Sequence, residues 1–356
     1  MRIVVDVSPL SHPRTGIGNY IRGSLGGMAA AAGDRHELVA FGPTSLRGPA
    51  AIEEALRGLP VRKKLVRLPA SHAVRTAWSR GGRPPVERFV GPLDAFVFSE
   101  WMYPAQRGGV RATVFHDLVP FHHPEWCTPR TVSMHTRKAR HAAETCDVVF
   151  ANSRFTAADL VEVLGIEEER IVPAPPGLAE GLGPEGEKAD LGGPAILALG
   201  TIEPRKNLAR LVEAWRLLDG EVGLVLAGGE GWGDRPDLAD PGIRRLGYVP
   251  DDEIARLYRG AAVYAYPSMF EGFGMPVVEA MACGTPVVAS AHPSLDEACG
   301  AAAIRVDPLD PEAIAAGVRE ALARREELVA LGLEHAARFS WERTGETMLT
   351  ALEERA

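Results

Sequence analysis

Residues 267–290 read PSMFEGFGMPVVEAMACGTPVVAS and contain a loop, a short helix and a strand in close succession. Pro276 has a fixed φ and no backbone donor, which suits the first turn of a helix, so we expect a helix to begin near Met275. Gly284 is expected to end this helix. The β-branched, apolar run over 285–290 then has the length and composition of a strand.

Two carboxylates flank the start of this helix. Glu271 lies in the loop, and Glu279 lies on the helix about one turn inside its positive end. Both can face a ligand that sits above that end, so the pair is a candidate binding site.

Short apolar runs, rich in valine and alanine, recur along the whole chain. Runs of this kind, spaced by helical stretches, are typical of strands that are buried on both faces of a parallel sheet. The sequence therefore predicts an α/β fold. The runs are RIVVDV (2–7), DAFVFS (94–99), ATVFHD (112–117), DVVFAN (147–152), AILALG (195–200) and GLVLAG (223–228).

The alternation of strands and helices occurs twice, with a proline- and glycine-rich break over 171–194 that suits a linker. We expect two doubly wound, Rossmann-like domains, 1–175 and 176–339, that face each other across a cleft. A C-terminal helix of about 340–356 is expected to pack back on the first domain. Ligands of such sheets bind at the carboxyl ends of the strands.

The chain has 356 residues, a net charge of −8 and 24% charged residues, a composition typical of globular proteins with sizeable cores. Its four cysteines form no CxxC pair and no zinc-like spacing with histidine, so we expect reduced thiols. The sequence shows no signal peptide and no apolar run long enough for a membrane span, which predicts a cytoplasmic protein.

The segment 61–90 is strongly basic, with eight Lys and Arg residues and only Glu87 opposing them. It is either a solvated surface or a surface for an anionic acceptor or anionic lipid headgroups, which would place the protein peripherally at the inner face of the membrane. No nucleic-acid-binding motif accompanies it, so we expect no nucleic-acid partner.

Arg205 and Lys206 follow the strand at 195–200 and precede an amphipathic helix. A cationic pair on a solvated turn is common, but this pair lies at a strand's carboxyl end, where a helix N-terminus and side-chain cations can bind a diphosphate.

Several residues of the first half lie at equivalent places. Gly16 and Gly18 follow the first strand, but the turn lacks the third glycine of a dinucleotide fingerprint. His116 and Asp117 end a strand, and His116 is either structural or a ligand contact. The adjacent His122 and His123 suit a solvated loop better than a metal site. Asn152 and Ser153 are expected to be packing and capping residues, with Ser153 capping the next helix up to Gly165.

Seven stretches together resemble the retaining GT-B glycosyltransferases of family 4, over nearly the whole chain. They are VVDVSPL (4–10) with TGIGNY (15–20), VFHDLVPFHHPEW (114–126), ANSRFTAADLVEVLGIEEERIVPAPPG (151–177), GTIEPRKN (200–207), RLGYVPDDEIARLY (245–258), the 267–290 segment and FSWERT (339–344).

The resemblance implies a nucleotide-sugar-binding domain over 176–339 and an acceptor-binding domain over 1–175. The implied catalytic residues are Arg205 and Lys206 on the diphosphate, Glu271 on the donor sugar, and His116. The implied donor contacts are Gly16, Gly18, Tyr248, Val249, Phe273, Gly274, Met275 and Glu279, with Glu279 on the ribose. The implied acceptor contacts are Asn19, Tyr20 and Asp117.

The resemblance also implies a retaining hexosyltransferase that moves a sugar to a glycan or lipid-linked acceptor in cell-envelope polysaccharide synthesis. GDP-mannose is the first choice of donor, followed by UDP-sugars. No cofactor is expected, and no metal, because no two aspartates stand two positions apart. The alternatives are a nucleotide-sugar 2-epimerase and a catalytically silent binding subunit of a glycan-assembly complex. A product epimerised at C2 would favour the first, and absence of slow donor hydrolysis the second.

Overall fold

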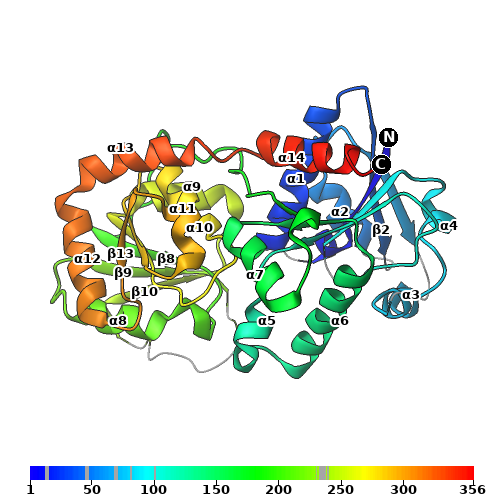
Figure 1. Ribbon diagram of the computed structural model, residues 1–356. Coiled ribbons are helices and arrows are strands. Elements are labelled where there is room, and N and C mark those ends of the chain that lie inside the picture. Colours follow the sequence, from blue (N-terminus) through cyan, green and yellow to red (C-terminus); the bar gives the residue numbers. More distant parts are fainter. Residues whose placement is uncertain are drawn as a thin grey trace. The chain divides into compact units, whose positions relative to one another are not determined.

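The computed structural model describes residues 1–12, 16–44, 48–67, 71–80, 82–99, 102–229, 231, 238 and 240–356. The chain forms two compact units: unit 1 is Met1–Gly177 with Ser340–Ala356, and unit 2 is Leu178–Phe339. Each unit has one parallel sheet with helices on both faces (Figure 1). No helix within these ranges is long and apolar enough to cross a membrane.

Unit 1 contains a seven-stranded parallel sheet with the order β3-β2-β1-β4-β5-β6-β7. Its strands are β1 (Arg2–Asp6), β2 (Glu37–Thr44), β3 (Arg62–Arg67), β4 (Ala95–Phe98), β5 (Val110–Phe115), β6 (Val148–Ala151) and β7 (Ile171–Pro173). Its helices are α1 (Gly16–Ala32), α2 (Gly48–Ala55), α3 (Ser71–Trp78), α4 (Glu87–Val90), α5 (Val119–His122), α6 (Pro129–Thr145), α7 (Arg154–Leu164) and α14 (Trp341–Glu353), with the 3-10 turns η1 (Ser8–Ser11), η2 (Pro124–Trp126) and η3 (Glu168–Arg170).

The sheet of unit 1 separates two apolar clusters. Successive residues of a strand point to opposite faces, so Ile3 and Val5 join the cluster under α1 and α14, whereas Val4 joins the cluster under α3, α4, α6 and α7. This is why the strand runs are apolar throughout.

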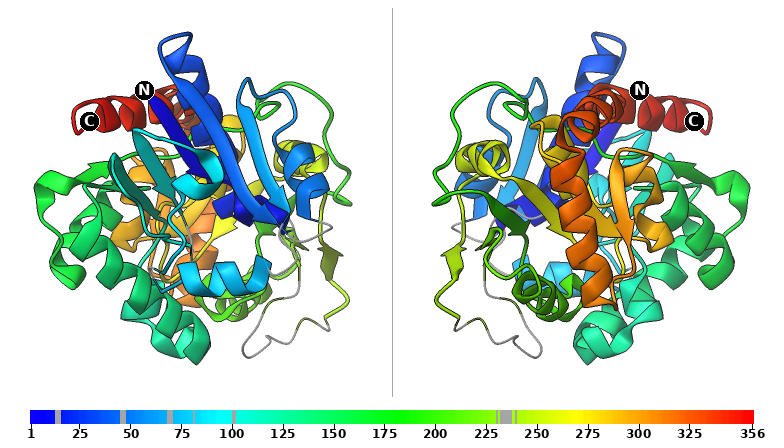
Figure 2. Two further views of the ribbon diagram at one scale, coloured as in Figure 1. Left: turned by 90° about the vertical axis from the view of Figure 1, so that its right-hand side faces the viewer. Right: turned by 90° about the vertical axis from the view of Figure 1, so that its left-hand side faces the viewer.

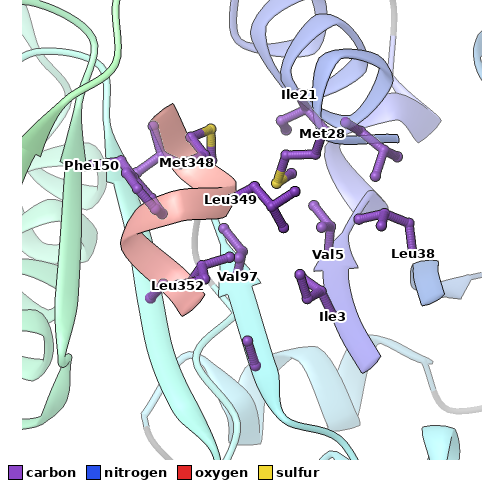
Figure 3. Packing of buried hydrophobic residues seen from close by; sticks show 14 of the residues in the cluster. Ile3, Val5, Ile21, Met28, Leu38, Val97, Phe150, Met348, Leu349 and Leu352 are labelled. Atoms are coloured by element: carbon purple, nitrogen blue, oxygen red, sulfur yellow. The ribbon is translucent and has the colours of Figure 1, made fainter. Parts of the chain in front are cut away.

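Helix α14 completes the first of these clusters although it is far from the rest of unit 1 in sequence. Its side chains Met348, Leu349 and Leu352 lie among residues of β1, β4, β6 and α1 (Figure 3). All three are at most 2% exposed. In Figure 1 and both views of Figure 2, α14 (red) lies against α1 (blue).

The contact between α1 and α14 is close because small residues line it. A Cβ at Gly27 would lie 1.8 Å from the carbonyl oxygen of Trp341, and a Cβ at Gly345 would lie 2.0 Å from the carbonyl carbon of Gly27. The two backbones therefore touch, and no side chain fits between them at these positions.

Unit 2 contains a six-stranded parallel sheet with the order β10-β9-β8-β11-β12-β13. Its strands are β8 (Ala195–Leu199), β9 (Gly223–Ala227), β10 (Ile243–Gly247), β11 (Val263–Tyr266), β12 (Val287–Ser290) and β13 (Ala303–Val306). Its helices are α8 (Leu208–Arg216), α9 (Asp251–Gly260), α10 (Met275–Ala282), α11 (Asp296–Cys299), α12 (Pro311–Ala323) and α13 (Arg325–Ala336), with the turns η4 (Pro204–Lys206) and η5 (Pro293–Leu295).

Helices cover both faces of this second sheet. Helices α8 and α12 share one apolar cluster with the sheet, and α9, α10 and α11 share the other. The strand order reverses between β8 and β11, which makes the ends of these two strands a switch point where ligands of open α/β sheets bind.

The predicted doubly wound α/β fold is confirmed, and so are the six strands named from the sequence and the helix that begins at Met275. One segment differs from the prediction, because the break over 171–194 begins with β7. The basic segment 61–90, for which no strand was expected, begins with β3, an exposed edge strand. Charged side chains on an edge strand discourage pairing with another chain.

Candidate functional site

Arg205 and Lys206 lie in the turn η4, which connects the carboxyl end of β8 to the start of α8. Asn207 follows in a left-handed conformation with φ 57°. Its amide donates to the carbonyl oxygens of Pro308 at 2.6 Å and Pro267 at 3.2 Å, which fixes the turn. The structure thus places both cations at the switch point of unit 2.

Both cations bind the carboxylate of Glu271, which is 6% exposed. Lys206 Nζ donates to Glu271 Oε1 at 2.7 Å, and Arg205 Nη1 donates to Oε2. The hydroxyls of Tyr266 and Ser268 donate to the same Oε1 at 2.8 and 2.6 Å. Glu271 is therefore held rigidly by the cations that the sequence had assigned to a diphosphate.

The charge of Glu271 is set by these neighbours. Burial alone would raise its pKa, but the charges of Arg205 and Lys206 and the hydrogen bonds from Lys206 and Ser268 outweigh burial and lower the pKa to about 2. Since the ordinary value is 4.5, the ionised form contributes stability above pH 4.5 that is lost as the pH falls toward 2. Burial, together with Arg205, lowers the pKa of Lys206, and Glu271 opposes this shift.

Glu279 lies on α10 and is held by a neighbouring helix. The hydroxyl of Tyr258 on α9 donates to Glu279 Oε2 at 3.1 Å. Burial, followed by the charge of Glu279, raises the pKa of Tyr258 well above 10, so this hydroxyl stays protonated and remains a donor. The carboxylate of Glu279 is half-buried.

The start of α10 presents backbone rather than side chains. Gly274 has φ 98°, and a Cβ there would lie 2.5 Å from Leu295 Cδ2, so only glycine fits. The ring of Phe273 is 3% exposed and packs edge-on against Phe339 at 5.3 Å. Of Phe273, Gly274 and Met275, the first two can therefore offer a ligand only backbone groups.

A cavity of about 230 Å³ lies at the same carboxyl edge, lined by the ends of β8, β9, β10 and β11. Its lining includes Lys206, Tyr266, Arg245 and Tyr248. Tyr248 is 65% exposed, which leaves its ring available for a planar ligand. Val249 is partly buried, packs on the apolar cluster of unit 2 and is not among the residues that line the cavity.

In unit 1, Gly16, Gly18 and Asn19 lie in the first turn of α1, after β1 and η1. Gly16 is exposed, Asn19 is half-buried and Gly18 is buried. The residues 13–15 that precede them lie outside the described residues.

Tyr20, expected to contact an acceptor, is a core residue. It is 1% exposed, and its hydroxyl donates to the carbonyl oxygen of Ala174 at 2.7 Å. Its ring packs edge-on against His116 and Trp341, with centroids 5.1 and 5.7 Å away. In this structure the side chain of Tyr20 therefore has a packing role rather than the expected place at an acceptor.

His116 directly follows β5. Its Nε2 is buried and has no hydrogen-bond partner among the described residues. Burial, with smaller contributions from Lys138 and His135, lowers the pKa of His116 to about 3, so the imidazole is neutral at physiological pH. Asp117 accepts a hydrogen bond from the backbone N–H of Val119 at 3.1 Å and thereby supports the turn into α5.

The two adjacent histidines have separate partners. His122 Nε2 lies 2.9 Å from both carboxylate oxygens of Asp159. His123 lies 3.0 Å from Glu125 Oε1 and stacks on Trp126 at 3.7 Å. In the part of the chain that the structure describes, no group of three His, Cys, Asp or Glu side chains could hold a metal ion.

Two smaller expectations concern the segment after β6. Ser153 caps α7 by accepting from the N–H of Thr156 at 2.9 Å, and Gly165 ends the helix in a left-handed conformation, both as predicted. Asn152 is 8% exposed, and its Oδ1 has no partner among the described residues. All four cysteines are free, as predicted.

Sequence analysis missed the residues that hold Glu271. Tyr266 and Ser268 donate to its carboxylate, and Ser294 Oγ accepts from its backbone N–H at 3.0 Å. Glu203, close to Arg205, was missed as well. Ser268 lies only three positions before Glu271, which is a usable signal; Ser294 gives none.

Comparisons with known proteins agree with this architecture. Residues 184–336 match the family described as "Glycosyl transferases group 1". The chain is 32% identical to O-antigen chain mannosyltransferase B of Escherichia coli over 96% of this chain and 97% of that protein. It is 32% identical to the D-inositol 3-phosphate glycosyltransferase of Segniliparus rotundus over 58% of this chain and 51% of that protein.

The fold also matches the solved structure of Anabaena HepE in complex with UDP and glucose. The TM-score is 0.70, with 15% identity, over 99% of this chain and 100% of that chain. Two doubly wound units of this kind are the GT-B architecture. The chain belongs to the group 1 glycosyltransferases, family 4, which use nucleotide-sugar donors, and the predicted family is confirmed.

Proposed function

We propose that this protein is a retaining, metal-independent hexosyltransferase that moves mannose from GDP-mannose to a hydroxyl of a glycan or lipid-linked acceptor in cell-envelope polysaccharide synthesis. Family membership supports transfer from a nucleotide sugar. The similarity to an O-antigen chain mannosyltransferase over nearly the whole chain supports mannose and a polysaccharide acceptor.

The observation that carries the proposal is the continuity of the site in unit 2. The cavity joins Lys206, beside Arg205, to the exposed ring of Tyr248. A nucleoside diphosphate matches a cavity that has cations at one place and an aromatic ring at another. Its diphosphate needs cations, and its base needs a flat apolar surface. In this proposal Glu279, one helix turn into α10, accepts hydrogen bonds from the ribose hydroxyls.

Guanine is the base in this proposal. Arg245 and Tyr248 both line the cavity. A guanidinium can donate two hydrogen bonds to O6 and N7 of guanine, whereas uracil offers no such pair of acceptors on that edge.

The proposed reaction is a front-side displacement. The bond between the anomeric carbon and the β-phosphate oxygen breaks while the acceptor oxygen bonds to the same face of that carbon, and the acceptor proton passes to the leaving oxygen. Arg205 and Lys206 stabilise the charge that develops on that oxygen. The neutral His116, whose buried Nε2 has no partner in the part of the chain that the structure describes, is a sugar-hydroxyl contact in this proposal. Gly16, Gly18, Asn19 and Asp117 remain proposed ligand contacts of unit 1.

The two carboxylates provide the test of this proposal. Glu279→Gln should lower the affinities for GDP and for GDP-mannose by a similar factor, about tenfold. Both ligands carry the ribose, and a charge-assisted hydrogen bond contributes about 1.5–3 kcal/mol. Glu271→Gln should leave the affinity for GDP unchanged but lower turnover. The reason is that Glu271 is proposed to contact the donor sugar, which GDP lacks. Calorimetry with GDP and UDP, beside steady-state kinetics with GDP-mannose, measures both effects.

The control for both variants is Glu213→Gln on α8, an exposed glutamate on the same unit. It should change neither affinity nor turnover. Equal losses of GDP affinity in the Glu271 and Glu279 variants would show that the two carboxylates do not divide the ligand between them. UDP binding more tightly than GDP would contradict the choice of base.

Metal independence follows from the same cations. Because Arg205 and Lys206 are placed to meet the diphosphate charge, we expect turnover to be unchanged in excess EDTA. A loss of activity that Mg²⁺ or Mn²⁺ restores would show that a metal ion meets this charge instead.

The basic segment 61–90 is proposed to contact anionic membrane lipid. On the edge strand β3, Arg62, Lys63, Lys64 and Arg67 are all exposed. Each basic residue near an anionic surface contributes about 1 kcal/mol of binding free energy at low salt.

Vesicle flotation tests this proposal. It should recover more protein with anionic than with neutral vesicles, and the double variant Lys63→Glu/Lys64→Glu should lose most of that difference. The matched pair Lys188→Glu with Arg338→Glu, on exposed positions of unit 2, should not. Equal recovery with both vesicles would leave β3 a solvated edge.

A further inference from the structure

A second buried carboxylate lies at the proposed diphosphate site. Glu203 is 7% exposed, and its Oε1 lies 2.7 Å from Nε of Arg205. An anion at this place opposes the binding of another anion. Its burial also has a desolvation cost, which a charged partner must offset. The geometry around Arg205 indicates the role of Glu203.

The guanidinium of Arg205 is held at two positions by carboxylates. Nε faces Glu203, and Nη1 faces Glu271 and the carbonyl oxygen of Phe270, the latter at 3.3 Å. The guanidinium is planar, so fixing these two nitrogens fixes the direction of the whole group.

The backbone of Arg205 is fixed independently of its side chain. Its carbonyl oxygen accepts from the N–H of Met269 at 2.8 Å and from Ser268 Oγ at 3.0 Å. Loss of Glu203 would therefore leave the turn in place and free only Nε of the guanidinium, while Nη1 stays bound to Glu271. This separates an effect on position from an effect on folding.

The site is also electrically balanced in the free protein. Arg205 and Lys206 carry two positive charges, and Glu203 and Glu271 carry two negative charges within the same set of contacts. A diphosphate therefore meets cations whose charge is already compensated. This limits how tightly the nucleotide product is held after transfer.

We propose that Glu203 is a positioning residue for the transfer reaction, which aims the guanidinium of Arg205 and weakens the hold on the nucleotide product. This inference rests on the function proposed above. Without the negative charge of Glu203, the positive charge of Arg205 is less compensated, so the free product is bound more tightly. The guanidinium is also no longer held at Nε, so it is less well aimed at the leaving oxygen when charge develops there in the transition state. Affinity and turnover should therefore move in opposite directions.

Glu203→Gln tests this inference because glutamine keeps the shape and one acceptor but removes the charge. We expect GDP affinity to rise about three- to tenfold and kcat with GDP-mannose to fall about tenfold. Calorimetry and steady-state kinetics measure the two quantities. The control Glu213→Gln removes the same charge from the exposed surface of α8 and should change neither.

A purely structural role of Glu203 predicts a different pattern, since damage to the site lowers both kcat and the affinity for GDP. That pattern, or an unchanged kcat, would overturn the role of Glu203. The proposed function is tested separately by the wild-type protein: if it binds neither GDP nor UDP, the diphosphate site itself is wrong. If the wild type binds GDP and Glu203→Gln binds it equally well, only the role of Glu203 fails.

Discussion

Replacing Lys206 by Ala is expected to lower turnover by about 10²- to 10³-fold, the effect of removing one preorganised charge stabiliser from an active site. Lys206 lies at the carboxyl end of β8, and its Nζ is fixed by Glu271 at 2.7 Å and by the hydroxyl of Tyr266 at 2.6 Å. A cation held this way needs no reorganisation when charge develops on the leaving phosphate. The loss should therefore appear mainly in kcat.

The variant must be shown to fold, because it leaves Glu271 buried with Arg205 as its remaining cation. Loss of Lys206 removes one of the charges that lower the pKa of Glu271, so part of the stability conferred by the ionised carboxylate should be lost at neutral pH. Far-UV circular dichroism and a thermal melt check this. Lys188→Ala, at an exposed position of the same unit, is the matched control. If Lys206→Ala retained wild-type kcat and donor affinity, Lys206 would not bind the diphosphate.

Gly27→Ala is expected to destabilise unit 1 by about 3 kcal/mol, the upper part of the range for overpacked contacts. In an ordinary helix this substitution stabilises by roughly 0.5–1 kcal/mol. The opposite sign is expected here because the new Cβ would lie 1.8 Å from the carbonyl oxygen of Trp341, and a backbone atom cannot move aside by changing rotamer. Helix α14 would have to shift away from α1.

Urea unfolding of the purified variant measures this effect. The control is Gly26→Ala, one position earlier on the same helix, where the nearest atom is the terminal Cδ2 of Leu59 at 3.1 Å. That methyl group can turn away, so Gly26→Ala should be neutral or slightly stabilising. If both variants had the same stability, the close approach of α1 and α14 would not exist in solution.

The sequence predicts well what depends on local pattern. Six strands, β1, β4, β5, β6, β8 and β9, could be named because they are apolar runs between helical stretches, as Ile3, Val4 and Val5 of β1 show. Pro276 and Gly284 predicted the two ends of α10 for local steric reasons. Strand β3 escaped notice because an exposed edge strand carries charges instead of an apolar run.

The sequence does not predict what depends on long-range contact. Arg205 and Glu271 are 66 positions apart, and their pairing follows from the adjacency of β8 and β11. Tyr20 belongs to a motif that resembles a ligand-binding loop, yet its ring is buried against Trp341, which reaches it only because the chain returns to unit 1. Burial of this kind cannot be inferred from a motif.

The return of the chain has a consequence for how the protein is made. Unit 1 begins the chain, but its apolar cluster lacks Met348, Leu349 and Leu352 until the whole of unit 2 has been synthesised. At a translation rate of 5–20 residues per second, residues 178–356 take roughly ten to forty seconds, during which one face of the first sheet has no α14 to cover it. Unit 2 is continuous in sequence and can finish folding first on the ribosome. The half of the protein that emerges first is therefore the half that matures last.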